Sequence, residues 1–218
     1  MGKKGFIFDL DGVIVDTAKY HYLAWKKLAN DIGISFSESQ NEHLKGVSRI
    51  RSLEKILDWG GVRLNQEDFN ELMAKKNEDY LRYIKTMNEN EILPDVKKIL
   101  NYLTQKGQAI ALGSASKNAR SILSMVSLKD EFDAIIDGND VTKAKPDPEV
   151  FLKAASAINI KPERCIVFED SLAGIQAANT ANMVSIGIGD KDTLKEAEYV
   201  FKDFTEMDID FIEFLIER

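Results

Sequence analysis

The sequence lacks both the pair of cysteines that a disulfide needs and the long apolar run that a membrane span needs. It contains one cysteine in 218 residues, which excludes an internal disulfide. Cys165 lies in the apolar run CIVF, where a buried filler is expected rather than a catalytic thiol. No apolar stretch is long enough to cross a bilayer, and no signal-peptide pattern is present. We therefore expect a cytoplasmic protein.

Basic residues are outnumbered by acidic ones. The 29 Lys and Arg are outnumbered by 36 Asp and Glu, which gives a net charge of −7, and no block of basic residues occurs. Because of this charge, neither a nucleic acid nor an anionic membrane is expected as a partner. An anionic substrate would need cations gathered locally at its binding site. Nucleotide-binding motifs are missing too, because there is no P-loop and GIG at 187–189 is an incomplete fingerprint. We expect a monomer.

From about Leu93 onward, short apolar runs alternate with amphipathic helical patterns. Such alternation predicts an α/β fold, in which a parallel sheet is covered by helices on both faces and binds ligands at the carboxyl ends of its strands. With 44% hydrophobic residues, the chain can bury a sizeable core. Strands are predicted at about 6–8, 109–112, 134–136, 165–168 and 184–186, and helices at about 96–103, 114–126, 146–158 and 174–181.

Residues 17–90 have helical periodicity throughout and separate the first strand from the others. They therefore predict a helical cap inserted into a Rossmann-like core made of residues 1–16 and 91–218. The expected helices lie before Gly33, at about 48–59 with Ile50, Leu53, Ile56 and Leu57 buried, and at about 66–87. Trp59 is expected in the core, and His43 on the surface.

Three residues of this segment have two interpretations. Lys76 falls on the apolar stripe of the third helix, so either its stem packs while its ammonium reaches water, or it serves a site. His21 and Trp25 share one face of the first helix, where they are either packing residues or part of a binding site.

The stretch FIFDLDGVIVD is the strongest signal in the sequence. Asp9 and Asp11 follow a buried strand and are two residues apart, so in an extended chain their side chains point to the same side. Gly12 lets the backbone turn tightly, and two carboxylates there form an all-oxygen site suited to Mg²⁺. A turn or capping role is the alternative, which we disfavour for DLDGV placed directly after a buried strand.

Later strand ends carry further polar residues, which a parallel sheet would bring to the same edge. Ser114 could hold a phosphate oxygen through its hydroxyl and the N–H groups that follow, or it could be a plain N-cap. Lys145 could supply fixed positive charge, while Glu169 and Asp170 could complete a metal shell.

The motif DxDGVxxD resembles the first motif of the haloacid dehalogenase superfamily of phosphoryl-transfer enzymes, and Ser114, Lys145 and Glu169-Asp170 resemble its later motifs. The resemblance implies that Asp9 is a nucleophile that becomes an aspartyl-phosphate, and that Asp11 is a general acid/base. It further implies one Mg²⁺, bound by Asp9, the backbone carbonyl of Asp11 and Asp170, with Glu169 supporting or joining them.

Five segments together resemble the sugar-phosphate mutases of that superfamily over essentially the whole chain, namely DLDGVIVDT, HYLAW, LKGVSR, SASKN and EDSLAGIQA. This implies interconversion of β-D-glucose 1-phosphate and β-D-glucose 6-phosphate, with β-glucose 1,6-bisphosphate as intermediate and activator. Arg49 would grip the phosphate that is not transferred, unless it is a solvated surface charge. The other implied substrate-binding residues are Thr17, His21, Trp25, Lys45, Gly46, Val47, Ser52, Lys76, Ala115, Ser116, Lys117 and Asn118.

Two other functions use the same core. A sugar-phosphate phosphatase would need the same four motifs but would let water attack the aspartyl-phosphate. A sugar-phosphate sensor without catalysis is disfavoured, because sensing needs neither a nucleophile at Asp9 nor a proton shuttle at Asp11.

Overall fold

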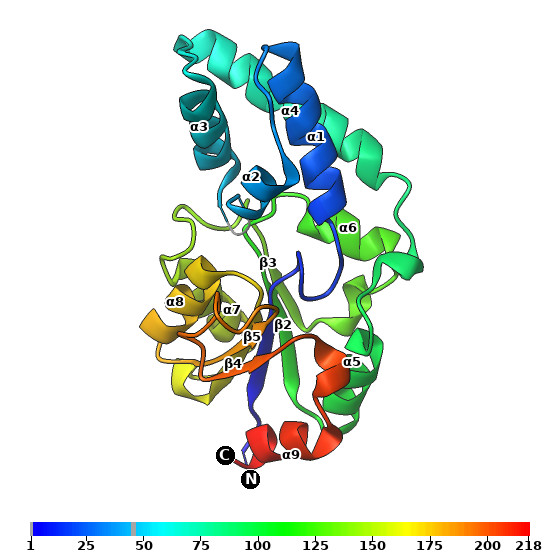
Figure 1. Ribbon diagram of the computed structural model, residues 1–218. Coiled ribbons are helices and arrows are strands. Elements are labelled where there is room, and N and C mark those ends of the chain that lie inside the picture. The colour runs from blue at the N-terminus through cyan, green and yellow to red at the C-terminus, as the bar shows by residue number, and fades with distance from the viewer. Residues whose placement is uncertain (1, 45–46) are drawn as a thin grey trace. The chain divides into compact units, whose positions relative to one another are not determined.

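The computed structural model describes residues 2–44 and 47–218 (Figure 1). The chain divides into two compact units, Met1–Asp16 with Asn88–Arg218, and Thr17–Met87. Each unit is described by itself. Lys45 and Gly46, expected in the substrate site, lie outside the described residues.

The first unit is built on a six-stranded parallel sheet, which confirms the predicted fold class. The strand order is β3-β2-β1-β4-β5-β6. All residues of β1 are buried, as expected for a central strand of a covered parallel sheet. The strands are β1 Gly5–Phe8, β2 Ala109–Gly113, β3 Ala134–Ile136, β4 Cys165–Glu169, β5 Val184–Ile188 and β6 Tyr199–Phe201. The sequence did not predict β6, because three half-buried edge residues leave no strong pattern.

Helices cover both faces of this sheet (Figure 1). The α-helices are α5 Val96–Gln105, α6 Ala119–Met125, α7 Glu149–Ala157, α8 Leu172–Thr180 and α9 Ile209–Glu217, and the short 3₁₀ helices are η1 Glu89–Glu91, η2 Lys129–Glu131, η3 Pro162–Arg164 and η4 Phe204–Glu206. One core cluster joins α7 and α8 to Ile7, Ala111 and Val167 of the central strands. Phe8 and Phe168, which directly follow Ile7 and Val167 in their strands, stack on each other with ring centroids 4.6 Å apart. Successive residues of each strand thus point to opposite faces of the sheet.

The predicted helix at 114–126 begins too early in our prediction. In the structure α6 starts at Ala119, and residues 114–118 form a loop. The reason is local competition for backbone donors. The hydroxyl of Ser114 accepts the N–H of Ser116 at 3.1 Å, and the hydroxyl of Ser116 accepts that of Asn118 at 3.3 Å. Serine bonds of this kind offer the backbone an alternative to the helix.

Strand order places the topological switch point of the sheet at β1. This strand pairs with β2 on one side and with β4 on the other, so the chain connections run outward in both directions from it. Ligands of open parallel sheets bind at such a switch point, beyond the carboxyl ends of the strands. The residues that follow β1, β2 and β4 are therefore the place to look for a site.

The second unit consists of α1 Ala18–Asp31, α2 Glu38–Glu42, α3 Arg49–Gly60 and α4 Gln66–Ile84. Its core cluster includes Trp25 and Leu28 of α1 with Leu53, Ile56 and Leu57 of α3. Sequence signals set the helix ends: the side chains of Ser48 and Asn65 cap α3 and α4, and Gly61 follows α3 with a φ of 63°. The helical insertion is thus a packed unit with its own core.

Two packing predictions for α3 are wrong. Ile50 is 55% exposed and Trp59 is 41% exposed, although we expected both to be buried. Ile50 lies in the first turn of α3, before the part of the helix that joins the core cluster at Leu53. Trp59 lies in the last turn, where its ring packs on Phe36 with centroids 6.3 Å apart and its remaining surface meets solvent.

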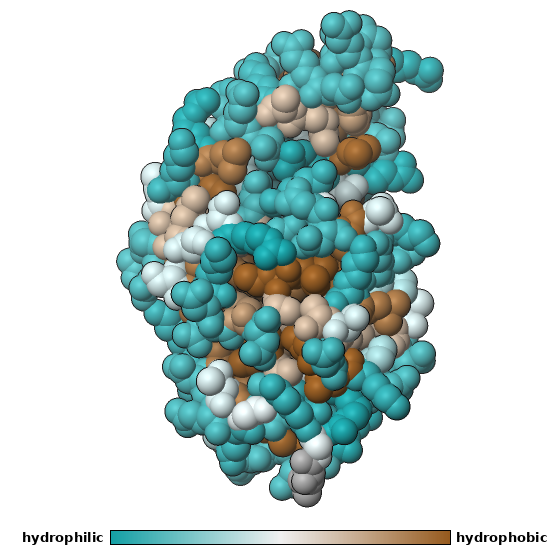
Figure 2. All heavy atoms as spheres, turned by 180° about the vertical axis from the view of Figure 1, so that it is seen from behind, coloured by the Kyte–Doolittle hydropathy of each residue, from teal (hydrophilic) through white to brown (hydrophobic). Residues whose placement is uncertain are grey.

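The face of the molecule that Figure 2 shows is mostly hydrophilic, with hydrophobic side chains showing in separate patches. The described part of the chain contains no helix that is both long and apolar enough to span a membrane.

Candidate active site

A buried ammonium joins two strands at the switch point. Lys145 Nζ donates to Asp9 Oδ1 at 2.6 Å and to Glu169 Oε1 at 2.5 Å. Asp9 directly follows β1 and Glu169 ends β4, so the sheet itself brings the two carboxylates together. The N–H of Asp9 continues the pairing by donating to the carbonyl of Phe168 at 2.9 Å. All three side chains are buried, so the two ion pairs are shielded from water.

The pKa values of Asp9 and Lys145 are both raised in this cluster, with opposite effects on their charge. Burial raises the pKa of Asp9 to about 7, against the opposing pull of Lys145, and the carboxylates of Glu169 and Asp11 add to the rise. Burial alone would lower the pKa of Lys145, but the attraction of Asp9 and Glu169 outweighs it and raises that pKa. Lys145 is therefore a permanent cation, while Asp9 is a carboxylate that a further positive charge would stabilise.

Glu169 is held on both of its oxygens. Oε1 accepts Lys145, while Oε2 accepts the N–H of Ser171 at 2.7 Å and its hydroxyl at 2.9 Å. Ser171 also caps α8 by accepting the N–H of Gly174 at 3.1 Å. The glycine is needed because a Cβ there would overlap the Glu169 carboxylate. Glu169 thus lies between the start of α8 and Lys145.

We expect Gly174→Ala to lower the free energy of unfolding by about 1–3 kcal/mol, because the added methyl displaces Glu169. A decrease in the free energy of unfolding would be diagnostic, because replacing Gly with Ala normally stabilises a helix by up to about 1 kcal/mol. Turnover should fall as well, since Lys145 loses a fixed partner. Urea unfolding and steady-state kinetics check both effects, and a variant more stable than wild type would contradict this account.

The loop after β1 brings a second acidic residue close. Asp11 N–H donates to Asp9 Oδ2 at 3.1 Å, which folds the loop back over the Asp9 carboxylate. Gly12 has a φ of 78°, and a Cβ at that position would overlap the carboxylate of Asp170. Asp170 therefore lies against the Asp11-Gly12 backbone, and the two carboxylates Asp9 and Asp170 flank one turn. The glycine is required here both by its conformation and by this approach.

The Ser114–Asn118 segment follows β2, the other neighbour of β1. We name it the phosphate loop after the phosphate-binding role that we propose for it below. Ser114 is buried, and its N–H donates to the carbonyl of Ile136 at 3.0 Å. Lys117 is exposed, whereas Ala115, Ser116 and Asn118 are half-buried. Asp9, Ser114 and Glu169 thus lie at the ends of the adjacent strands β1, β2 and β4, while Lys145 contacts Asp9 and Glu169 from the loop that precedes α7.

Within the helical unit, Lys76 forms a buried cationic site. It is only 2% exposed, so the interpretation in which its ammonium reaches water is wrong. Its Nζ lies 3.0 Å from His21 Nδ1, 4.5 Å from the centroid of the Trp25 ring and 4.7 Å from that of Tyr80. These rings offer their negative faces to the ammonium.

The pKa of His21 is well below its usual value, first because of burial and then because Lys76 and Arg49 are cationic. A lysine ammonium can only donate, so Nδ1 of the neutral ring accepts and Nε2 carries the proton. Of the remaining predicted residues of this unit, Thr17 and Ser52 are buried, while Val47 and Arg49 are half-buried.

Comparison with known proteins now identifies the family. The model of the haloacid dehalogenase-like hydrolases matches residues 3–182. The chain belongs to the haloacid dehalogenase-like hydrolase family. This confirms the superfamily resemblance, and the family match spans both units.

Relatives of this haloacid dehalogenase-like chain include mutases and phosphatases. It is 40% identical to a β-phosphoglucomutase of Bacillus subtilis over 96% of this chain and 93% of that protein. It is 31% identical to a fructose-1-phosphate phosphatase of Escherichia coli over 84% of this chain and 95% of that protein. The crystal structure of a β-phosphoglucomutase from Clostridium difficile aligns with a TM-score of 0.94 and 40% identity, covering 99% and 98% of the two chains.

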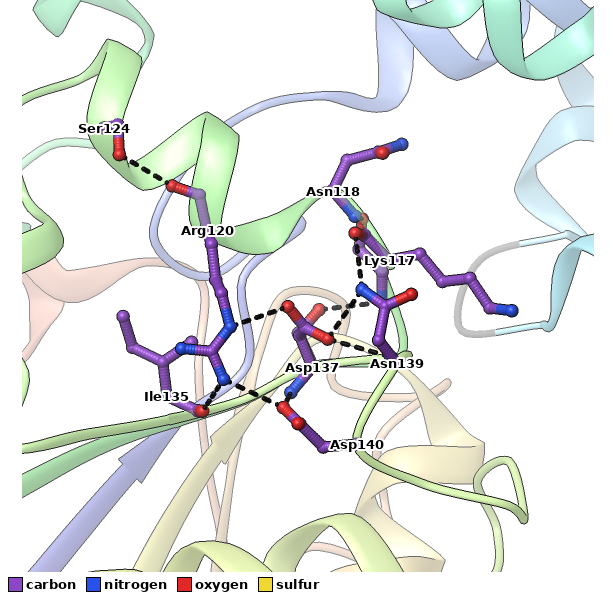
Figure 3. Close-up of polar contacts among 10 residues, drawn as sticks. Lys117, Asn118, Arg120, Ser124, Ile135, Asp137, Asn139 and Asp140 are labelled. Atoms are coloured by element: carbon purple, nitrogen blue, oxygen red, sulfur yellow. Dashed lines mark hydrogen bonds and ion pairs between the residues drawn. The ribbon is translucent and has the colours of Figure 1, made fainter.

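Some residues of this haloacid dehalogenase-like site were missed by our sequence analysis. Ser171 and Gly174 fix Glu169, and the segment Asp137–Asp140 contacts the phosphate loop (Figure 3). A usable signal existed, because Asp-Gly-Asn-Asp directly follows β3 as the other polar clusters follow their strands. From the connection after this strand we singled out only Lys145 and passed over the four residues that directly follow the strand.

Proposed function

We propose that this enzyme interconverts β-D-glucose 1-phosphate and β-D-glucose 6-phosphate through β-glucose 1,6-bisphosphate. The observation that carries the proposal is the 40% identity to the Bacillus subtilis β-phosphoglucomutase, which extends over 96% of the chain and thus includes the helical unit. The core alone would not specify a substrate, because one fold serves many reactions.

In the proposed reaction, a carboxylate oxygen of Asp9 attacks the phosphorus of the bisphosphate, and the bond from phosphorus to the sugar oxygen breaks. Asp11 gives its proton to that leaving oxygen. In the return step Asp11 takes a proton from a sugar hydroxyl, whose oxygen attacks the aspartyl-phosphate and restores Asp9. Lys145, 2.6 Å from Asp9, keeps positive charge beside the transferring group.

The residues present fit an Mg²⁺ ion, although the described residues hold no ready-made cluster of three or more acidic, histidine or cysteine side chains. We propose that the carboxylates of Asp9 and Asp170, which flank the Asp11-Gly12 turn, and the carbonyl of Asp11 hold it. Both oxygens of Glu169 already accept hydrogen bonds, so its role is to support this set. The ion would offset the repulsion between Asp9 and the incoming phosphate.

A mutase must keep water from the aspartyl-phosphate and present a sugar hydroxyl to it. We propose that the helical unit serves this purpose as a cap, with Arg49 binding the phosphate that is not transferred. Supporting this role, Arg49 lies close enough to His21 for its charge to lower the pKa of the ring. A guanidinium fork can bind two phosphate oxygens at once. His21, Trp25, Ser52 and Lys76 would line the cap side, and the protein would act as a cytoplasmic monomer.

Arg49→Ala should raise KM for β-glucose 1,6-bisphosphate by about 10- to 100-fold, the effect of losing a charged hydrogen bond. Hydrolysis of a simple aryl phosphate, which has no second phosphate, should change far less. Arg51→Ala is the matched control, because Arg51 is exposed on the same helix and pairs with Glu54. Equal losses on the two substrates would sink the proposed distal role.

The proposal is tested by phosphorus NMR of the protein with Mg²⁺, β-glucose 1-phosphate and a trace of the 1,6-bisphosphate. Build-up of glucose 6-phosphate without matching inorganic phosphate is the expected result. Inorganic phosphate as the main product would favour the second candidate, a sugar-phosphate phosphatase. The 31% identity to a fructose-1-phosphate phosphatase is the observation in its favour.

A further inference from the structure

The turn after β3 holds the rear of the phosphate loop. We call this turn, Asp137–Asp140, the backing loop. Gly138 N–H donates to the carbonyl of Ser116 at 3.2 Å, and Asn139 Nδ2 donates to the carbonyl of Lys117 at 3.0 Å. A Cβ on Gly138 would overlap the carbonyl oxygen of Ala115. Three consecutive carbonyls of the phosphate loop therefore face the backing loop.

This arrangement determines where the N–H groups of the phosphate loop point. In a planar trans peptide, the C=O of one residue and the N–H of the next point in opposite directions. The N–H groups of Ser116, Lys117 and Asn118 must then point away from the backing loop. Those of Ser116 and Asn118 do so, toward the hydroxyls of Ser114 and Ser116. Donors and hydroxyls thus gather on the face where an anion would bind.

The backing loop is itself rigidly held (Figure 3). Asp137 is buried, and its Oδ1 accepts the backbone N–H of Asn139 at 2.8 Å and its Nδ2 at 3.0 Å. Its Oδ2 pairs with Arg120 Nε at 3.1 Å. Arg120 also donates to the carbonyl of Ile135 at 2.6 Å and to Asp140 at 2.9 Å.

Arg120 belongs to α6, the helix that follows the phosphate loop, so the network connects that helix with β3. The Lys117 side chain extends away from the network (Figure 3). The network therefore fixes the backbone of the phosphate loop without occupying the side chains that would meet a ligand.

We infer that Asn139 and Gly138 are positioning residues for phosphate binding. They fix the carbonyls of the phosphate loop, so that the Lys117 N–H and the Ser114 and Ser116 hydroxyls, which accept the N–H groups of Ser116 and Asn118, are preorganised for an anion. The inference rests on the proposed function only in that the Ser114–Asn118 segment binds a phosphoryl group. It holds equally for a mutase and a phosphatase, because both must bind that group before the second acceptor attacks.

Asn139→Ala is the first test, since Asn139 is exposed and its loss leaves the core intact. The probe is inorganic phosphate, titrated calorimetrically into the Mg²⁺-loaded full chain. Loss of one hydrogen bond that orders the loop should weaken phosphate binding roughly two- to tenfold. KM for β-glucose 1-phosphate should rise by the same factor while kcat changes less, and the thermal midpoint should match that of Asn101→Ala, an exposed asparagine in α5.

Gly138→Ala provides a second test, because its methyl should push back the carbonyl of Ala115 and weaken phosphate binding further. Phosphate affinity equal to wild type in both variants would overturn the inference. So would losses of kcat and thermal stability that run in parallel with the loss of affinity, or failure of the wild type to bind phosphate. If phosphorus NMR finds a phosphatase while Asn139→Ala binds phosphate weakly, the mutase proposal falls and this inference stands.

Discussion

Asp9→Asn is expected to lower kcat by more than about 10⁴-fold, as removal of a catalytic nucleophile does in other enzymes. An amide oxygen cannot form the aspartyl-phosphate, although asparagine is nearly the same size and can still accept the N–H of Asp11. The wild-type protein, quenched in acid after brief exposure to the bisphosphate, should carry one phosphoryl group by mass spectrometry. The variant should carry none.

Asp130→Asn is the control for this experiment, because Asp130 is an exposed residue of η2 in the same unit. It should keep wild-type turnover and phosphorylation. Near-normal turnover in Asp9→Asn, or a phosphoryl group trapped on that variant, would remove Asp9 as the nucleophile. Neither result would alter the fold, since family membership rests on the comparison and not on this residue alone.

Lys145→Met should produce the largest loss of stability. It leaves the buried carboxylates of Asp9 and Glu169 facing each other without the ammonium that bridges them. Removing one partner of a buried ion pair costs about 3–5 kcal/mol. Lys153→Met is the matched control: Lys153 pairs with Glu149 on α7 but is 44% exposed, so its loss should cost less than about 1 kcal/mol. Urea unfolding of both variants near pH 8 makes the comparison.

The loss of stability caused by Lys145→Met should depend on pH in a defined direction. With Lys145 present, the pKa of Asp9 is already about 7, and removing the cation raises it further. A folded-state pKa above the unfolded value means that the folded protein binds more protons, so it gains stability as pH falls through that pKa. The deficit of Lys145→Met relative to wild type should therefore shrink as the pH falls from about 9 toward about 7, because below that Asp9 is protonated in both folded proteins. A deficit that stays constant over this range would argue against uncompensated buried carboxylates as its cause.

Where the sequence pattern was regular, prediction from it succeeded. Buried runs such as Phe6–Phe8 and Cys165–Phe168 are strands in the structure, and their alternation with helices predicted the parallel sheet. Because carboxyl ends of parallel strands share one edge, Asp9, Lys145 and Glu169 could be assigned to one site before any coordinate was known. The resemblance then supplied the chemistry that spacing could not.

Other predictions were wrong because they depended on contacts that the sequence pattern does not reveal. The segment after β2 was assigned to a helix, but serine hydroxyls accept its backbone N–H groups, so α6 starts five residues later. Ile50 and Trp59 satisfy the helical period and are nevertheless exposed, since periodicity reports only which side of a helix is apolar. Whether the first or last turn of a helix packs against other residues depends on which elements lie next to it.

The sequence by itself determined the fold class, the inserted helical segment and the identity of the acidic and cationic residues at the strand ends. Only the tertiary structure decided how those residues share their bonds. Lys145 donates to Glu169, Lys76 is buried against His21 and two aromatic rings, and Asn139 donates to a carbonyl of the phosphate loop. Periodicity and motifs are local, whereas each of these contacts joins residues from different parts of one packed unit, and distance in space is fixed only by packing.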